Sequence, residues 1–64
     1  KITVTVNHVM EDEHYIEWIA CVSDKSICKK FLNPGEKAEV TFKYFPNLTL
    51  YSYCNKHGLW KQDV

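Results

Sequence analysis

Residues 33–45 read Asn-Pro-Gly-Glu-Lys-Ala-Glu-Val-Thr-Phe-Lys-Tyr-Phe, a turn signal followed by a run in which apolar and polar side chains alternate. Proline sets φ at the first central position of a tight turn, and glycine accepts the positive φ that such a turn can require. Alternation with a period of two, here over 38–45, is the pattern of a strand that buries one face. We therefore predict a turn that leads directly into a strand.

The same period of two recurs along most of the chain. The predicted strands cover 1–7, 14–22, 26–32, 38–45 and 48–53, and a sixth follows Gly58. In the second strand Ile16 and Trp18 share a wholly apolar parity, so both are expected to face the core. The segment 9–14 is too short for a helix that is stable alone, and we predict a loop there. Five or six short strands without a convincing helix indicate an all-β antiparallel sandwich.

The length and charge of the chain restrict its class. The 64 residues include eight acidic and eight basic side chains, for a formal net charge of zero. A chain of this length forms one domain, 1–64, and buries only about 60% of its unfolded surface, so a metal, a disulfide or a partner commonly supports it. Nothing in the balanced charge indicates a nucleic-acid partner, and no apolar run approaches the ~20 residues of a membrane span. Because Lys1 already lies in strand-like sequence, we expect the domain to be incomplete at its N-terminus.

Three cysteines occur in the chain, Cys21, Cys28 and Cys54. An odd number cannot all pair within one chain, and a small secreted scaffold usually carries a larger, even number. We therefore expect a cytoplasmic, reducing location in which at least one thiol is free. Cys21 and Cys28 flank a short loop between two predicted strands. A cross-strand disulfide is one interpretation, and two reduced thiols are the favoured one.

Every histidine and Cys54 falls at the end of a predicted strand or in the turn beyond it. His8 continues the inward parity of the first strand, His14 opens the second, and Cys54 closes the fifth, with His57 three residues later in a turn that ends at Gly58. Such strand ends converge, and a Cys-x-x-His turn lets two side chains reach one ion. A thiolate with several imidazoles suits iron, zinc or copper. Each residue alone is more often a satisfied surface or core group, so the spacing leaves a metal-free domain open.

Three longer stretches add a resemblance to a known family. Residues 8–19 read His-Val-Met-Glu-Asp-Glu-His-Tyr-Ile-Glu-Trp-Ile, residues 53–60 read Tyr-Cys-Asn-Lys-His-Gly-Leu-Trp, and residues 30–35 read Lys-Phe-Leu-Asn-Pro-Gly. They closely resemble the HPMxxxHxIEWI signature, the YCNxHGxW signature and the KFLxPG turn of superoxide reductases, the desulfoferrodoxin and neelaredoxin family. The resemblance runs from about residue 8 to residue 61, nearly the whole chain.

The resemblance implies an immunoglobulin-like sandwich that holds one iron between four equatorial histidines and an axial cysteine thiolate. By that resemblance His8, His14 and His57 would be equatorial ligands and Cys54 the axial ligand. Iron would reduce superoxide by one electron, with release of hydrogen peroxide. A rubredoxin-like protein would return the electron, and the domain would form homo-oligomers.

The chain also departs from the family pattern. The EKHxP motif, which supplies the fourth histidine and the lysine that guides superoxide, is absent from these residues. Val9 stands where the family has proline, which loosens the loop between two ligands. Lys56 stands at a usually apolar position; it is a candidate substitute for the missing lysine, although a solvated turn lysine is the simpler interpretation. Trp60, like Trp18, is expected to be a core or site-shielding aromatic.

These departures leave two further hypotheses beside the reductase. A closed site of three histidines and one cysteine could hold zinc or iron without redox activity, since four ligands satisfy zinc. A plain β-sandwich interaction domain without metal is the third hypothesis, and the two long signatures argue against it.

Overall fold

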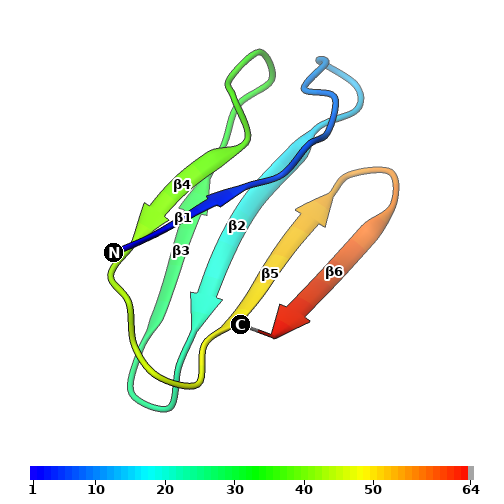
Figure 1. Ribbon diagram of the computed structural model, residues 1–64. Helices are drawn as coiled ribbons and strands as arrows, with labels where there is room; N and C mark the ends of the chain where they lie inside the picture. The colour runs from blue at the N-terminus through cyan, green and yellow to red at the C-terminus, as the bar shows by residue number, and fades with distance from the viewer. Residues whose placement is uncertain (64) are drawn as a thin grey trace.

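A computed structural model describes residues 1–63 of the chain, and over that range it contains six strands and no helix (Figure 1). The strands are β1 (Ile2–Thr5), β2 (Ile16–Val22), β3 (Ile27–Phe31), β4 (Glu39–Phe42), β5 (Thr49–Cys54) and β6 (Gly58–Asp63). Each strand falls where the alternation predicts one, so the all-β class and the strand number are confirmed. Along this described range, no helix is long and apolar enough to span a membrane.

The six strands form two antiparallel sheets. The smaller sheet pairs β1 with β4, and the larger has the order β3-β2-β5-β6. The β2–β3 and β5–β6 pairs are local hairpins, whereas β1–β4 and β2–β5 join segments distant in the chain. Figure 1 shows β1 and β4 in front of the larger sheet, with β5 and β6 extending beyond them. A two-stranded layer therefore covers only part of a four-stranded one.

The core lies between the two sheets and reaches one end of the sandwich. Its most buried side chains are those of Ile16, Ile19 and Cys54. The other buried members of the cluster are Cys21, Leu32, Ala38, Val40, Phe42 and Leu48. Each fully buried aliphatic side chain contributes about 1.5–3 kcal/mol relative to an exposed one. Because Cys54 is part of this cluster, the end of β5 is packed against the core, and the Cys54 side chain is closed to solvent.

The strand β2 does not alternate in the way that its sequence predicts. Ile16 lies opposite Cys54, but Trp18 lies opposite Tyr53, so the register with β5 shifts between Ile16 and Trp18. Such a β-bulge adds one residue, here Glu17, and turns the following side chains over. The expectation that Ile16 and Trp18 both face the core is therefore wrong. Ile16 is buried, whereas Trp18 stacks on Tyr53 on the opposite face, with ring centroids 5.9 Å apart.

Candidate metal centre

Two connections meet at one end of the sandwich. One is the loop between β1 and β2, which carries His8 and His14, and the other is the β5–β6 turn, which carries His57 directly after Cys54 at the end of β5. Figure 1 shows both connections at the same end. The pairing of Ile16 with Cys54 explains this arrangement, since it places the beginning of β2 beside the end of β5. His14 lies two residues before that pair.

The loop between the two histidines is ordered by backbone hydrogen bonds. Glu11 and His14 each donate an N–H to the other's carbonyl oxygen, over 2.9 and 3.1 Å, which closes a tight turn. Met10 accepts a hydrogen bond from the Gly35 N–H at 2.7 Å, and its sulfur lies 3.4 Å from the Ile16 nitrogen. The predicted loop is thus held against β2 and the β3–β4 connection, although Val9 replaces the proline of the family signature.

The β5–β6 turn brings the cysteine and the third histidine together. Cys54 pairs with Gly58 across the hairpin, which leaves a loop of three residues, 55–57. Gly58 has a φ of 84°, a conformation that loops of this length favour and that glycine adopts without steric cost. As a result, the Cys54 sulfur lies 3.5 Å from Nδ1 of His57.

All four predicted ligand residues converge. One donor atom from each of His8, His14, Cys54 and His57 lies within 4.8 Å of the donor atoms of the other three. The three imidazole rings meet edge to face, with centroids 4.7–5.6 Å apart. Donor atoms that each lie about 2.0–2.3 Å from one ion are separated from one another by distances close to those between these four atoms. The structure thus brings together the four residues, while their role as ligands stays a prediction.

The hydrogen bonds of the histidines fit a metal ion. Nδ1 of His8 lies 2.6 Å from the Val9 carbonyl oxygen and donates a hydrogen bond to it, so in the neutral ring Nε2 carries the lone pair. Nε2 of His8 and Nε2 of His14 are both buried, and neither has a hydrogen-bond partner among the described residues 1–63. An unpaired buried polar atom costs about 1–3 kcal/mol. An ion bound to both lone pairs would remove that cost, and a backbone carbonyl on the second ring nitrogen is the usual support of a ligating histidine.

The surroundings of His14 favour its neutral form. Burial lowers the pKa of His14, and the neighbouring His57, His8 and Lys56 lower it further, while Glu11 acts in the opposite direction. A neutral imidazole is the form that binds a metal ion, so His14 needs to lose no proton at neutral pH.

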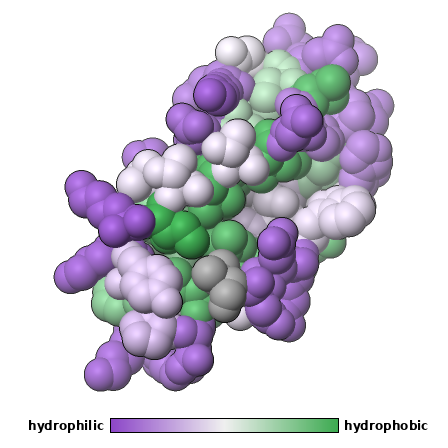
Figure 2. Space-filling view, in the orientation of Figure 1, coloured by the Kyte–Doolittle hydropathy of each residue, from purple (hydrophilic) through white to green (hydrophobic). Residues whose placement is uncertain are grey.

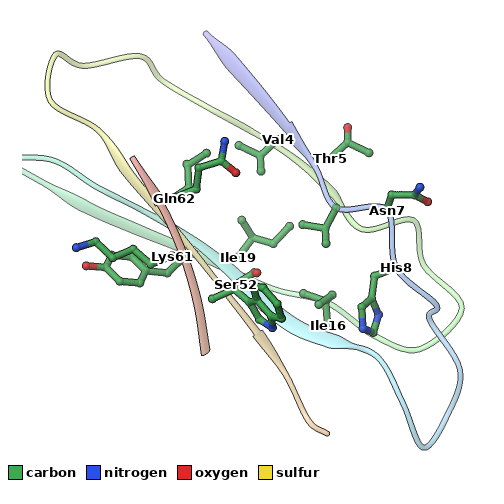
Figure 3. A pocket seen from close by; sticks show the side chains of 13 residues that line it. Val4, Thr5, Asn7, His8, Ile16, Ile19, Ser52, Lys61 and Gln62 are labelled. Atoms are coloured by element: carbon green, nitrogen blue, oxygen red, sulfur yellow. The ribbon is translucent and has the colours of Figure 1, made fainter. Parts of the chain in front are cut away.

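Lys56 and Trp60 lie on two different sides of the cluster. Lys56 lines a shallow hollow together with His14 and the acidic segment 11–13. Trp60 lines a separate open groove of about 410 Å³ with His8 and Ile16 (Figure 3). Trp60 is 62% exposed and Trp18 lies on the outer face, so neither is a core aromatic, while a site-shielding role of Trp60 stays a prediction. Figure 2, in the orientation of Figure 1, shows hydrophobic residues along the middle of the visible face of the sandwich.

Asn55 is a positioning residue to which the sequence analysis gave no role. Its Nδ2 donates to the Glu13 carbonyl oxygen at 2.9 Å, and its Oδ1 accepts from the Tyr15 N–H at 3.0 Å. Its own N–H donates to the Tyr15 carbonyl oxygen at 3.2 Å. Asn55 therefore ties the turn that carries His57 to the loop that carries His14. In the sequence, the feature that indicates this role is a side-chain amide, which can both donate and accept a hydrogen bond, directly after the candidate ligand Cys54.

The fold and the cluster together define a class of protein, an antiparallel β-sandwich with a cluster of three histidines and a cysteine at one end that could hold a metal ion. Comparison with known proteins agrees. The Desulfoferrodoxin family profile matches residues 1–63. The desulfoferrodoxin of Nitratidesulfovibrio vulgaris is 45% identical over 66 residues, which cover 100% of this chain and 52% of that protein. That of Clostridium acetobutylicum is 42% identical over 60 residues, which cover 94% and 48% respectively.

A solved structure supports the same assignment. The crystal structure of the superoxide reductase from Treponema pallidum matches with a TM-score of 0.76 at 37% identity, over 89% of this chain and 48% of that one. The chain belongs to the desulfoferrodoxin family, as a domain of the superoxide reductase type. It spans about half the length of the relatives that it matches.

Proposed function

We propose that the chain is the iron-binding domain of a superoxide reductase, in which superoxide gains one electron and two protons and leaves as hydrogen peroxide. The observation that carries the proposal is the pair of Nε2 atoms of His8 and His14, which have no hydrogen-bond partner among residues 1–63 and belong to the same cluster as Cys54 and His57. Bound iron would supply the electron. The family membership supports iron, which the donor set also suits.

The ligand residues would give the site a charge that attracts superoxide. Neutral imidazoles of His8, His14 and His57 add no charge, and the Cys54 thiolate adds one negative charge. A divalent ion held by this set keeps a net positive charge and draws in an anion. Lys56, in the hollow beside His14, would strengthen this attraction, although carboxylates of the segment 11–13 oppose it.

Two further features of the proposed site are its access to solvent and its fourth histidine. The open groove beside His8 would leave that side of the ion accessible to a small anion. The family resemblance implies a fourth histidine, and we assign it to residues outside this chain, since the chain spans about half of its relatives. A rubredoxin-like electron donor, a homo-oligomer and a cytoplasmic location stay predictions.

A structural zinc site is the second candidate function. The four donor atoms within 4.8 Å of one another equal the number that zinc requires in a closed tetrahedral site. In that case no coordination position would be left for superoxide, and the ion would only join the histidine loop to the β5–β6 turn.

Metal content and optical absorption would separate the two candidates. The chain is purified without oxygen, loaded with Fe²⁺ or Zn²⁺ in parallel, and oxidised. The proposal predicts one iron per chain, a visible thiolate-to-iron band that Cys54→Ser abolishes, and consumption of superoxide without evolution of oxygen. Exclusive binding of zinc, or an iron form that neither absorbs in the visible range nor reacts with superoxide, would leave only the structural site.

A further inference from the structure

Two cysteines outside the metal cluster face each other across the β2–β3 hairpin. Cys21 in β2 and Cys28 in β3 are direct register partners, and both thiols are free. Directly opposed residues of an antiparallel pair point to the same face. Cys21 is buried in the core, so both lie on the inner face, and Cys28 is exposed because β3 is an edge strand.

The hydrogen bonds of the hairpin show which kind of pair this is. The Leu32 N–H donates to the Glu17 carbonyl oxygen at 2.8 Å, and the Ser23 N–H donates to the Ser26 carbonyl oxygen at 2.9 Å. Hydrogen-bonded and non-hydrogen-bonded pairs alternate along an antiparallel ladder. Ser23 and Ser26 lie two positions from the cysteines along the ladder, and Glu17 and Leu32 lie four positions from them. Because both numbers are even, Cys21 and Cys28 also form a hydrogen-bonded pair.

This geometry permits a disulfide and also makes it easy to reduce. The Cα atoms of a hydrogen-bonded pair lie about 5.5 Å apart, inside the range of about 4.4–6.8 Å that disulfides span. The Cβ atoms of such a pair lie about 5.5 Å apart, whereas a relaxed disulfide requires about 3.8 Å. The bond therefore pulls β3 inward. All five residues of β3 are exposed, so the strand meets little packing resistance to this shift.

We propose that Cys21 and Cys28 form a reversible dithiol site that takes a hydroperoxide as its substrate. The Cys28 thiolate attacks the terminal peroxide oxygen, the O–O bond breaks, and a sulfenic acid forms while water, or an alcohol from an organic peroxide, leaves. The Cys21 sulfur then attacks the Cys28 sulfur, the S–O bond breaks, and water leaves. Two thiols lose two electrons and two protons, and hydrogen peroxide becomes two waters. A small-molecule thiol restores the pair by exchange.

The exposure of the two thiols sets their order. Cys28 is exposed and meets peroxide in solution, whereas Cys21 is 4% exposed and meets only its partner. Burial raises the pKa of the Cys21 thiol, and so does the neighbouring Cys28. Cys21 therefore acts second, as the thiol that resolves the sulfenic acid.

This dithiol is separate from the metal cluster. Cys21 lies opposite Leu50, four residues before Cys54 on β5, a distance of about 13 Å at a strand rise of about 3.3 Å per residue. Hydrogen peroxide is also the product of the proposed reductase. Oxidation by added peroxide needs neither iron nor superoxide, so the two proposals can fail independently.

Tryptic mapping after peroxide treatment tests the proposal directly. The reduced chain receives one equivalent of hydrogen peroxide without oxygen, remaining thiols are alkylated, and trypsin cuts after lysine. Cys21 then lies in the peptide 2–25, Cys28 in 26–29 and Cys54 in 44–56. The expected product joins 2–25 to 26–29, lighter by two hydrogens than the two peptides, and dithiothreitol separates it. A Cys28 that stops at sulfinic acid, or a bridge only to 44–56, would overturn the proposal.

A register-shifted variant provides the matched control. Ile27→Cys combined with Cys28→Ser keeps an exposed thiol on β3, because Ile27 is 74% exposed, but moves it to the outer face. Its bridge to Cys21 should fall at least tenfold, with an unchanged circular dichroism spectrum. An equal yield would show that the register does not direct the bond. In Cys21→Ala, the Cys28 sulfenic acid should persist and react with dimedone, whereas an unreactive Cys28 would contradict its role as the attacking thiol.

Discussion

Replacing Asn55 with alanine removes two side-chain hydrogen bonds that join the two ligand-bearing connections. One runs to the Glu13 carbonyl oxygen over 2.9 Å and the other comes from the Tyr15 N–H over 3.0 Å. An intramolecular hydrogen bond contributes about 0.5–1.5 kcal/mol net, so the pair contributes about 1–3 kcal/mol. Both bonds are exposed, and water can take the place of the lost groups. We therefore expect a loss in the lower half of that range.

Most of this loss should appear in metal binding and less of it in folding. The backbone bond from Asn55 to the Tyr15 carbonyl remains, and so does the pairing of Ile16 with Cys54, so the two connections stay adjacent. What is lost is the position of His14 relative to Cys54. Removal of a group that orients a ligand typically lowers metal affinity about 10–100-fold, and the hydrogen bonds lost here correspond to the lower end of that range, about 10-fold.

A competition titration would measure the effect. Zn²⁺ or Co²⁺ is exchanged between the protein and a chromophoric chelator, and a urea titration of each metal-free variant gives its stability. Gln62→Ala is the control, since Gln62 is an exposed amide whose side chain makes no hydrogen bond to the described residues. Asn55→Asp keeps the acceptor for Tyr15 but loses the donor for Glu13, and should fall between the two. If Asn55→Ala bound metal as tightly as the unmodified chain, the assignment of Asn55 as a positioning residue would be refuted.

Three further predictions concern the turn, the protonation of the site and the core. Gly58→Ala should destabilise the chain by at least about 1 kcal/mol in urea, because φ is 84° there although no atom lies within 4 Å of the added Cβ; an unchanged midpoint would exclude a constrained turn. The pKa of His14 is lowered, so just below the ordinary histidine value of about 6.5 the unfolded chain binds more protons than the folded one, and the metal-free chain should lose stability as the pH falls from 7.5 to 5.5. A urea midpoint that rises on acidification would contradict this sign. Ile19→Ala, at a fully buried position, should cost about 2–5 kcal/mol, whereas Ile27→Ala, at an exposed one, should stay within about 0.5 kcal/mol in the same titration.

The strands were predictable from the alternation of apolar and polar residues, and burial follows that alternation in β1 and β4. In β4 the alternation is complete, with Val40 and Phe42 buried and Glu39 and Thr41 exposed. The convergence of the histidines with Cys54 followed from the same parity, since each lies at or just beyond a strand end. Parity gave the wrong face for Trp18 because the pairing of β2 with β5 inserts a residue before it.

The features that sequence did not reveal depend on contacts between distant segments. Asn55 bonds to Tyr15, 40 residues away in the chain, and no local pattern encodes that approach. The exposure of Trp60 depends on the width of the opposite sheet, in which β1 and β4 do not extend over β6. The pairing of Cys21 with Cys28 lies between these cases, because a hairpin was expected and only its register was missing.

The bulge at Glu17 has a consequence for both ends of β2. Ile16 and Cys21 are five positions apart, an odd number, and in an unbroken strand they would face opposite sides of the sheet. Both are buried in the same core, Ile16 beside Cys54 and Cys21 beside Cys28. One inserted residue thus places the β2 partner of Cys54 and the β2 partner of Cys28 on the same face of the sheet. Deletion of Glu17 would leave Ile16 and Cys21 four positions apart, an even number, so a regular strand without a bulge would keep the histidine end and the thiol end of β2 on the same face.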